Sequence, residues 1–244
     1  MKIAIASTCA PFKGEKNIIQ RAALDSWSHQ PNANIYLLGK DDASEAICDV
    51  YPNFKYLPTV LTAKHIGFHS NAILLDDAFQ VLSINLQDEE VVVWINSDII
   101  ILENDLSKLL YVLKNEGQGK LVAWSRRRNL ANWRDCFAMN YEILLQLGFN
   151  EFCEFNSTLQ THSGIDGFFF DVEFFKNLWV PRFVVNAWFS DDYFRIHLPK
   201  LHNNVKDLSK IVKLIHPNHD VPIQKNPEWQ KMMERNRELR EKYQ

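Results

Sequence analysis

The most informative stretch of this sequence is Val91-Val92-Val93-Trp94-Ile95-Asn96-Ser97-Asp98-Ile99-Ile100-Ile101-Leu102. Apolar side chains run without interruption up to Ile95, which predicts a strand over residues 90–95 that is covered on both faces. Strands of this kind lie inside sheets that carry helices on both sides. The stretch therefore indicates an α/β fold, with the carboxylate of Asp98 at the end of a buried strand.

The segments around this strand alternate in character. Apolar runs predict strands at residues 3–6, 34–38, 54–57 and 121–124. Helical spacing of apolar residues predicts helices at residues 17–27, 43–50, 70–82 and 105–114. Alternating strands and helices are typical of parallel strands joined by crossover helices, so residues 1–125 are expected to form a Rossmann-like half.

The pattern changes in the second half. Short strands are predicted at residues 168–170, 183–185 and 211–215, with a helix at 191–197. We expect residues 126–222 to complete one domain of residues 1–222. The charged segment 223–244 is predicted to form a solvated or peripheral helix that packs by Trp229 and Met233.

Composition narrows the class of protein. The chain has 244 residues, 46% of them apolar, which suits a single large domain. A net charge of −3 provides no basic field for non-specific nucleic-acid binding. The four cysteines have no metal-like spacing and are expected to be free thiols. The sequence shows no signal peptide and no apolar stretch of about 18 residues that would span a bilayer, so a cytoplasmic protein is expected.

Ligands of such sheets bind outside the carboxyl ends of the strands. The loops after Ala6, Leu38, Ile95 and Trp124 should open on that edge. An ionised Asp98 in apolar surroundings needs a partner, and a divalent cation bound to a diphosphate would provide one. On spacing alone, an aspartate that caps a turn accounts for the residue equally well.

Three acidic or histidine-containing segments of the second half are candidates for the same site. Asp166 stands between two glycines before an aromatic strand, where it either approaches a ligand or caps a turn. Asp191 and Asp192 stand at a predicted helix start, where one could deprotonate a hydroxyl or could serve as an N-cap. His219 lies in the segment His216-Pro217-Asn218-His219-Asp220 and could complete a metal site begun by Asp98, or be a surface histidine.

Arginine and tryptophan side chains add further candidates. Arg126 follows a predicted strand at the ligand edge and would suit a phosphate, or be a solvated basic turn. Trp133, Trp179 and Trp188 could stack on sugar rings, although most tryptophans serve to pack a core.

In combination these segments resemble a family of small bacterial and viral glycosyltransferases with the GT-A fold, over residues 1–221. The resemblance implies a Rossmann-like nucleotide-binding half with a mixed, mainly parallel sheet, followed by an acceptor-binding half. The stretches that carry the resemblance keep the family's order: residues 20–27, 35–39, 74–79, 94–102, 125–127, 163–170 and 216–220. Asp98 matches the last aspartate of the Asp-X-Asp motif, and Asn96 stands where the first aspartate often stands. Asp191 falls in a Ser-Asp-Asp-Tyr segment where similar sequences carry Trp-Asp-Asn-Trp.

The resemblance implies a nucleoside-diphosphate-sugar donor, a glycan or other hydroxyl acceptor, and Mn²⁺ or Mg²⁺ as cofactor. We expect the metal at Asp98 and His219. If the transfer inverts, Asp191 is favoured as the base over Asp166 or Asp192, and Asp166 would hold donor or acceptor hydroxyl groups. The expected donor-binding residues are Ser7, Thr8, Pro11, Asp41, Asp76, Asn96, Ser97, Asp98 and Arg126.

Two other classes of protein would share parts of this pattern. A nucleotidyltransferase would carry a glycine-rich loop with arginine and lysine after the first strand, but residues 7–14 contain one glycine and no arginine. A non-catalytic sugar-binding or scaffolding protein would account for the aromatic residues and the imperfect Asp-X-Asp motif.

Overall fold

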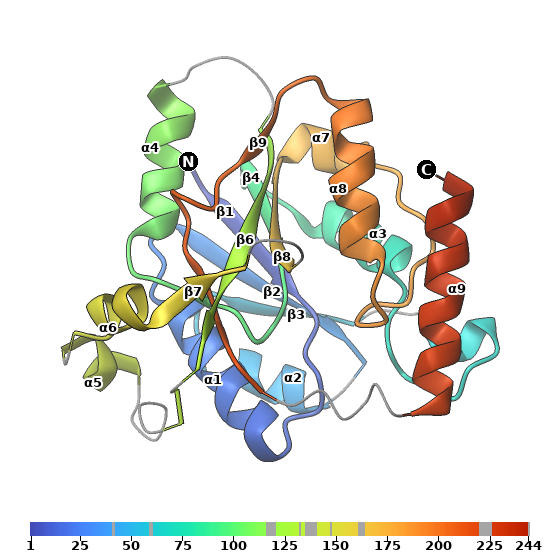
Figure 1. The fold of residues 1–244 in the computed structure, drawn as a ribbon, viewed down its shortest axis with the longest axis horizontal. Helices are drawn as coiled ribbons and strands as arrows, with labels where there is room; N and C mark the ends of the chain where they lie inside the picture. The colour runs from blue at the N-terminus through green and yellow to red at the C-terminus, as the bar shows by residue number, and fades with distance from the viewer. Residues whose placement is uncertain are drawn as a thin grey trace.

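The centre of the molecule is a mixed sheet that carries helices on both faces (Figure 1). The computed structural model describes residues 1–40, 42–58, 61–115, 121–131, 133–134, 141–146, 148–160, 164–219 and 226–243. Within them the sheet has the strand order β3-β2-β1-β4-β8-β6-β10-β5, and both β7 and β9 pair with β6. The strands are β1 (Ile3–Ser7), β2 (Ala33–Gly39), β3 (Phe54–Pro58), β4 (Val91–Ile95), β5 (Ile100–Ile101), β6 (Val122–Leu130), β7 (Ser157–Leu159), β8 (Ile165–Asp171), β9 (Val205–Asp207) and β10 (Leu214–Pro217).

The first four strands are parallel, as the sequence predicts. β1 lies between β2 and β4, and β2 pairs with β3. β8 then enters antiparallel between β4 and β6. This confirms a mixed α/β sheet in which the carboxyl ends of β1, β2, β4 and β6 share one edge.

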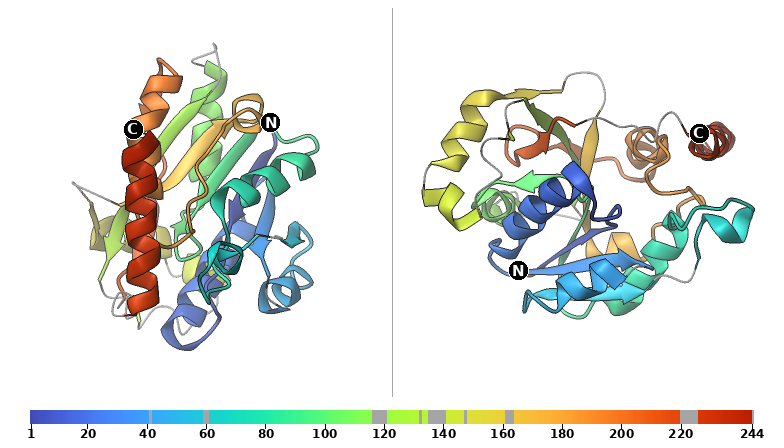
Figure 2. Two further views of the ribbon diagram at one scale, coloured as in Figure 1. Left: turned by 90° about the vertical axis from the view of Figure 1, so that its right-hand side faces the viewer. Right: turned by 90° about the horizontal axis from the view of Figure 1, so that it is seen from below.

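Alternate residues of the central strands reach two separate cores. The side chains of Ile5 and Val93 pack toward α1 and α4, whereas those of Ala6 and Val92 pack toward α3 and α8. Figure 2 shows the helices on either side of the sheet. The helices are α1 (Gly14–Ser28), α2 (Asp42–Cys48), the 3-10 helix η1 (Ala63–Ile66), α3 (Leu75–Asn85), α4 (Asp105–Asn115), α5 (Tyr141–Gln146), α6 (Phe149–Asn156), α7 (Val172–Lys176), α8 (Ser190–Leu201) and α9 (Pro227–Tyr243).

Helix α1 holds the segment that follows β4. The indole Nε1 of Trp27 donates to the carbonyl of Ile99 over 2.8 Å. Nearer the start of the helix, the Oε1 atom of Gln20 accepts from the hydroxyl of Ser97 over 2.8 Å. The turn that carries Asp98 is therefore fixed from one side by a single helix.

Helix α9 lies at the periphery but is not solvated on all sides. It runs beside α8 in Figure 1, and Trp229, Met232 and Asn236 are buried against the body. Met233 is partly buried in the same cluster. No helix in the described part of the chain combines the length and apolarity needed to cross a bilayer.

Several predicted boundaries are wrong, each because of a tertiary contact. The predicted helix 70–82 begins only at Leu75, because Ile73 and Leu74 form bridges with Thr62 and Val184. The predicted strand 183–185 is reduced to that one bridge at Val184.

Two strands extend further than the sequence predicts. β6 does not end at residue 124 but continues to Leu130, because β7, β8 and β10 pair with its polar second half. β10 covers Leu214–Pro217 rather than residues 211–215, so His216 belongs to a strand. Both shifts change which side chains reach the carboxyl edge of the sheet.

Replacing Trp27 by Phe tests the contact between α1 and the segment after β4. The substitution leaves the buried carbonyl of Ile99 without its donor, so the free energy of unfolding should fall by roughly 1–3 kcal/mol in urea titrations. The matched control Trp179→Phe changes a side chain that is 58% exposed, so its effect should stay within about 0.5 kcal/mol. Equal effects of both substitutions would contradict this role of Trp27.

Candidate functional site

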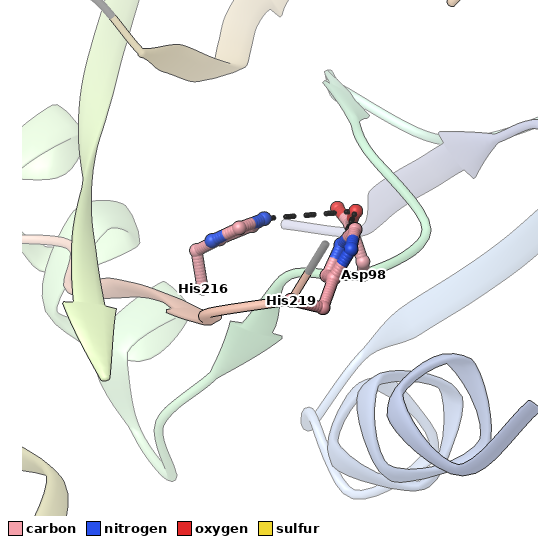
Figure 3. Close-up of side chains that lie close together, drawn as sticks. All are labelled: Asp98, His216 and His219. Atoms are coloured by element: carbon pink, nitrogen blue, oxygen red, sulfur yellow. Dashed lines mark hydrogen bonds and ion pairs between the residues drawn. The ribbon is translucent and has the colours of Figure 1, made fainter. Parts of the chain in front are cut away.

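Three side chains converge at the carboxyl edge of the sheet (Figure 3). Asp98 lies in the turn between β4 and β5, His216 lies in β10, and His219 follows that strand. The Nε2 atom of His219 lies 3.1 Å from the Oδ2 atom of Asp98, and the Nε2 atom of His216 lies 3.7 Å from the same oxygen. One ligand atom from each residue lies within 4.8 Å of the other two, so the three side chains could hold a metal ion.

The electrostatics of Asp98 keep its carboxylate charged. Burial raises the pKa of Asp98, but the close contacts and charges of His216 and His219 outweigh burial and hold this pKa well below its usual range. The Oδ1 atom of Asp98 is buried and has no hydrogen-bond partner among the described residues. A buried anionic oxygen without a donor fits a cation ligand.

Asn96 is bonded to Asp166. Its Nδ2 atom donates to the Oδ1 atom of Asp166 over 2.6 Å, and its backbone N–H donates to the Asp166 carbonyl over 3.2 Å. These bonds continue the antiparallel pairing of β4 with β8 by one residue. An aspartate at position 96 would set a second carboxylate against the first, so Asn96 has a structural reason to differ from the Asp-X-Asp pattern.

Asp166 is 5% exposed and lies within β8 rather than in a turn. Burial raises its pKa, opposed chiefly by the charge of Arg127. The Nη1 atom of Arg127 lies 3.4 Å from Oδ2 of Asp166. Gly167 serves packing here, because a Cβ atom at this position would lie 2.5 Å from Cδ1 of Leu214.

Asp191 differs from Asp98 and Asp166 because it has few partners. Phe189 is the N-cap of α8, so neither Ser190 nor Asp191 caps that helix. Burial, followed by the charge of Asp166, raises the pKa of Asp191 to about 7. The neighbouring Asp192 instead lies 3.5 Å from a guanidinium nitrogen of Arg195 and of Arg240.

The predicted donor-binding side chains are distributed differently from the expectation. The hydroxyl of Ser7 donates to the carbonyl of Ile95 over 2.6 Å, and that of Ser97 donates to Gln20. Thr8 is buried and Pro11 exposed on the loop after β1. Asp41 lies outside the described residues.

Asp76 belongs to a different part of the surface. Its Oδ2 atom accepts from Nε of Arg182 over 2.8 Å. Together with Trp179 and Tyr243, it lines a cavity of about 480 Å³ between α3, α7 and α9. None of Asp98, His216 and His219 is among the described residues that line this cavity.

The structure also gives Arg126 a partner away from Asp98. Its guanidinium pairs with Asp207 over 2.9 Å, and Arg127 is the neighbour that contacts Asp166. The sequence pattern does not identify Arg127 or His216 as residues of the site. The missed signal is strand alternation, because Arg126 and Arg127 stand on opposite sides of a strand that was expected to end before them.

The three tryptophans that could stack on sugar rings differ in their exposure to solvent. Trp133 is buried in the core, whereas Trp179 and Trp188 are 58% and 51% exposed. Trp188 precedes Asp191 by three positions.

Asn96→Asp tests the pairing with Asp166. In metal-free buffer the paired carboxyls should share one proton, so the folded-state pKa of one of them rises above its unfolded value. The stability of the variant should therefore approach that of the wild type near pH 4 and fall as the pH rises toward 7, by roughly 1–3 kcal/mol. Thermal unfolding of wild type, Asn96→Asp and the uncharged control Asn96→Ala measures this, and a loss independent of pH would contradict the pairing.

Comparison with known proteins gives information on the fold of this chain. No family model matches the sequence, and comparison with curated proteins gives no match. Among solved structures, S. aureus TarS 1-349 in complex with UDP-GlcNAc is similar with a TM-score of 0.59 and 13% identity, over 97% of this chain and 65% of that chain. The same protein in complex with UDP gives a TM-score of 0.56 and 13% identity over the same shares. TarS 1-349 alone gives 0.55 and 13% identity, over 89% of this chain and 60% of that one.

The chain thus spans slightly less than two thirds of the length of the TarS 1-349 structures. At this identity the likeness concerns the arrangement of strands and helices. The GT-A type of mixed α/β fold expected from the sequence is confirmed.

Proposed function

We propose that this protein is a glycosyltransferase that moves a sugar from a nucleoside-diphosphate-sugar donor to a hydroxyl group of an acceptor. The observation that carries the proposal is the Asp98, His216 and His219 cluster at the carboxyl edge of a GT-A type sheet. In such sheets this edge receives nucleotide ligands. The structures of TarS with UDP-GlcNAc and with UDP support a donor of this class.

The cluster would hold a divalent cation. Metal–ligand distances are about 2.1 Å for nitrogen and oxygen donors, so ligand atoms within 4.8 Å of one another need only small adjustments. Mg²⁺ binds mainly carboxylates, phosphates and water, and two imidazoles are poor ligands for it. Of the two cations implied by the family resemblance, Mn²⁺ therefore fits better. When bound, the cation supplies positive charge to the departing diphosphate.

Asp191 is the proposed base. An acceptor hydroxyl must lose its proton as the new bond forms, and a carboxylate whose pKa is about 7 suits this transfer at neutral pH. Asp166 is less suited, because Asn96 donates to its Oδ1 atom and the guanidinium of Arg127 lies 3.4 Å from its Oδ2 atom, which accepts no hydrogen bond from the described residues. We assign Asp166 the role of holding Asn96 and donor or acceptor hydroxyls.

The donor would lie along the loops after β1 and β4. The side chains of Ser7 and Ser97 are bonded within the protein, so these residues would offer backbone groups rather than hydroxyls. Thr8 and Pro11 lie on the same edge. Arg127, through its contact with Asp166, is placed nearer to the carboxylates than Arg126 is.

Asp98→Asn tests the cation site through binding. Wild-type protein should show a higher melting temperature with UDP and Mn²⁺ together than with UDP alone, by roughly 2–4 °C for each kcal/mol of linked binding energy. The variant should lose the metal-dependent part of this shift and should lose transfer activity. Asp88→Asn, which removes an exposed carboxylate paired with Lys2, is the matched control and should behave as the wild type.

Binding with the other nucleotides should be compared in the same assay. An Asp98→Asn protein that keeps the metal-dependent shift would refute the assignment of Asp98. No metal-dependent shift of the wild type with UDP, GDP, dTDP or CMP would favour a non-catalytic scaffold.

Asp191→Asn tests the base. Its kcat should fall by roughly 10²–10⁴-fold while donor affinity stays unchanged. In the wild type, kcat/KM should rise with pH through about 7, because the base acts in its deprotonated form. The control Asp192→Asn removes a carboxylate already paired with arginines and should keep most of kcat. An unchanged kcat in Asp191→Asn would place the base elsewhere.

A further inference from the structure

The turn before α8 has an unusual backbone. Asn186, Trp188 and Phe189 have φ values of 67°, 52° and 67°, in the left-handed region. Asparagine adopts this conformation more readily than most residues with a side chain, but it is an outlier for bulky residues such as tryptophan and phenylalanine. Backbone strain of this kind persists only where surrounding contacts determine it. The turn ends two residues before Asp191.

Asn236 of α9 supplies most of those contacts. This side chain is fully buried, and its Oδ1 atom accepts from the N–H of Val184 over 2.9 Å. Its Nδ2 atom donates to the carbonyls of Val184, Ala187 and Trp188 over 2.8, 3.2 and 3.0 Å. One amide therefore binds the backbone of Ala187 and Trp188 in the turn and of Val184 just before it.

Two further residues of α9 hold the same turn. The indole Nε1 of Trp229 donates to the carbonyl of Asn186 over 3.0 Å. The guanidinium of Arg240 lies 4.8 Å from the ring centroid of Phe189, the N-cap of α8, and 3.5 Å from a carboxylate oxygen of Asp192. The turn is thus held by side chains from both ends of α9.

We propose that α9 is the element that positions Asp191, with Asn236 as its main positioning residue. By keeping the turn left-handed, Asn236 fixes where α8 begins and so where the Asp191 carboxylate points. Arg240 holds Asp192 aside, which leaves Asp191 as the carboxylate that faces the reaction. This inference rests on the proposed role of Asp191 in sugar transfer.

The placement of Asp191 depends on elements that the cation cluster does not use. Asp98 lies after β4 and both histidines follow or belong to β10, whereas Asp191 is set by α8 and α9. Loss of the contacts between α9 and the turn should therefore reduce kcat and leave donor binding intact. The charged groups that face Asp191 are Asp166 from β8, Arg127 from β6 and Asp192 from α8.

The test compares Asn236→Leu with wild type and with Leu109→Ala, a buried substitution in α4 that packs in the other core. Leucine is close to asparagine in size but makes none of its four hydrogen bonds. All proteins are assayed well below their melting temperatures. We expect kcat of Asn236→Leu to fall by roughly ten- to a hundredfold, the effect of a misplaced reacting group, with donor KM within about twofold of wild type.

The pH profile separates positioning from general destabilisation. A relaxed turn exposes Asp191 to water, so the acidic limb of kcat/KM should move from about 7 toward the ordinary carboxyl range. Leu109→Ala should unfold at a lower temperature than the wild type and yet keep the wild-type kcat and pH profile. Trp229→Phe, which loses only the bond to Asn186, is the milder second variant and should show the same split with a smaller fall in kcat.

Three results would overturn the inference. Wild-type kcat in both Asn236→Leu and Trp229→Phe would show that Asp191 is positioned without the contacts from α9. A rise in donor KM as large as the fall in kcat would show that Asn236 acts only through the stability of the fold. An unchanged pH profile despite a lower kcat would show the same. If the wild type transfers no sugar, the proposed function fails instead. Hydrogen exchange then decides whether α9 holds the turn, since residues 184–194 should exchange faster in Asn236→Leu while residues 91–102 stay unchanged.

Discussion

Three carboxylates lie at one edge of the sheet, and the cost of burying their charges shapes everything around them. Asp98 is compensated by two histidines, Asp166 by Asn96 and Arg127, and Asp191 by almost nothing. The three environments shift the pKa values apart, downward for Asp98 and upward for Asp166 and Asp191. The same chemical group therefore binds a proton more readily at Asp166 and Asp191 than at Asp98.

The core of the fold could be predicted because its signal is local. The apolar runs of β1, β2 and β4 are buried on both faces, and short runs of this kind are typical of strands inside a sheet that helices cover. β6 was predicted too short for the opposite reason. Its second half carries three arginines and an asparagine, and it remains a strand because neighbours on both sides pair with it.

The site was only partly predictable. The structure brings together Asp98 and His219, as the order of motifs implied, but His216 joins them because β10 extends past residue 215. The left-handed turn at residues 186–189 has no sequence signature, since it contains no glycine and depends on Asn236, far along the chain. Boundaries and turns set by distant side chains escape any argument from periodicity.

Gln20 has a further consequence for how this site can change. Its amide accepts from the N–H of Ala10 and donates to the Ala10 carbonyl, and it also accepts from the hydroxyl of Ser97. The loop after β1 and the turn that carries Asp98 are thus joined through one buried side chain of α1. They cannot vary independently. A graft that exchanged either loop for that of another protein of this fold would have to transplant α1 with it.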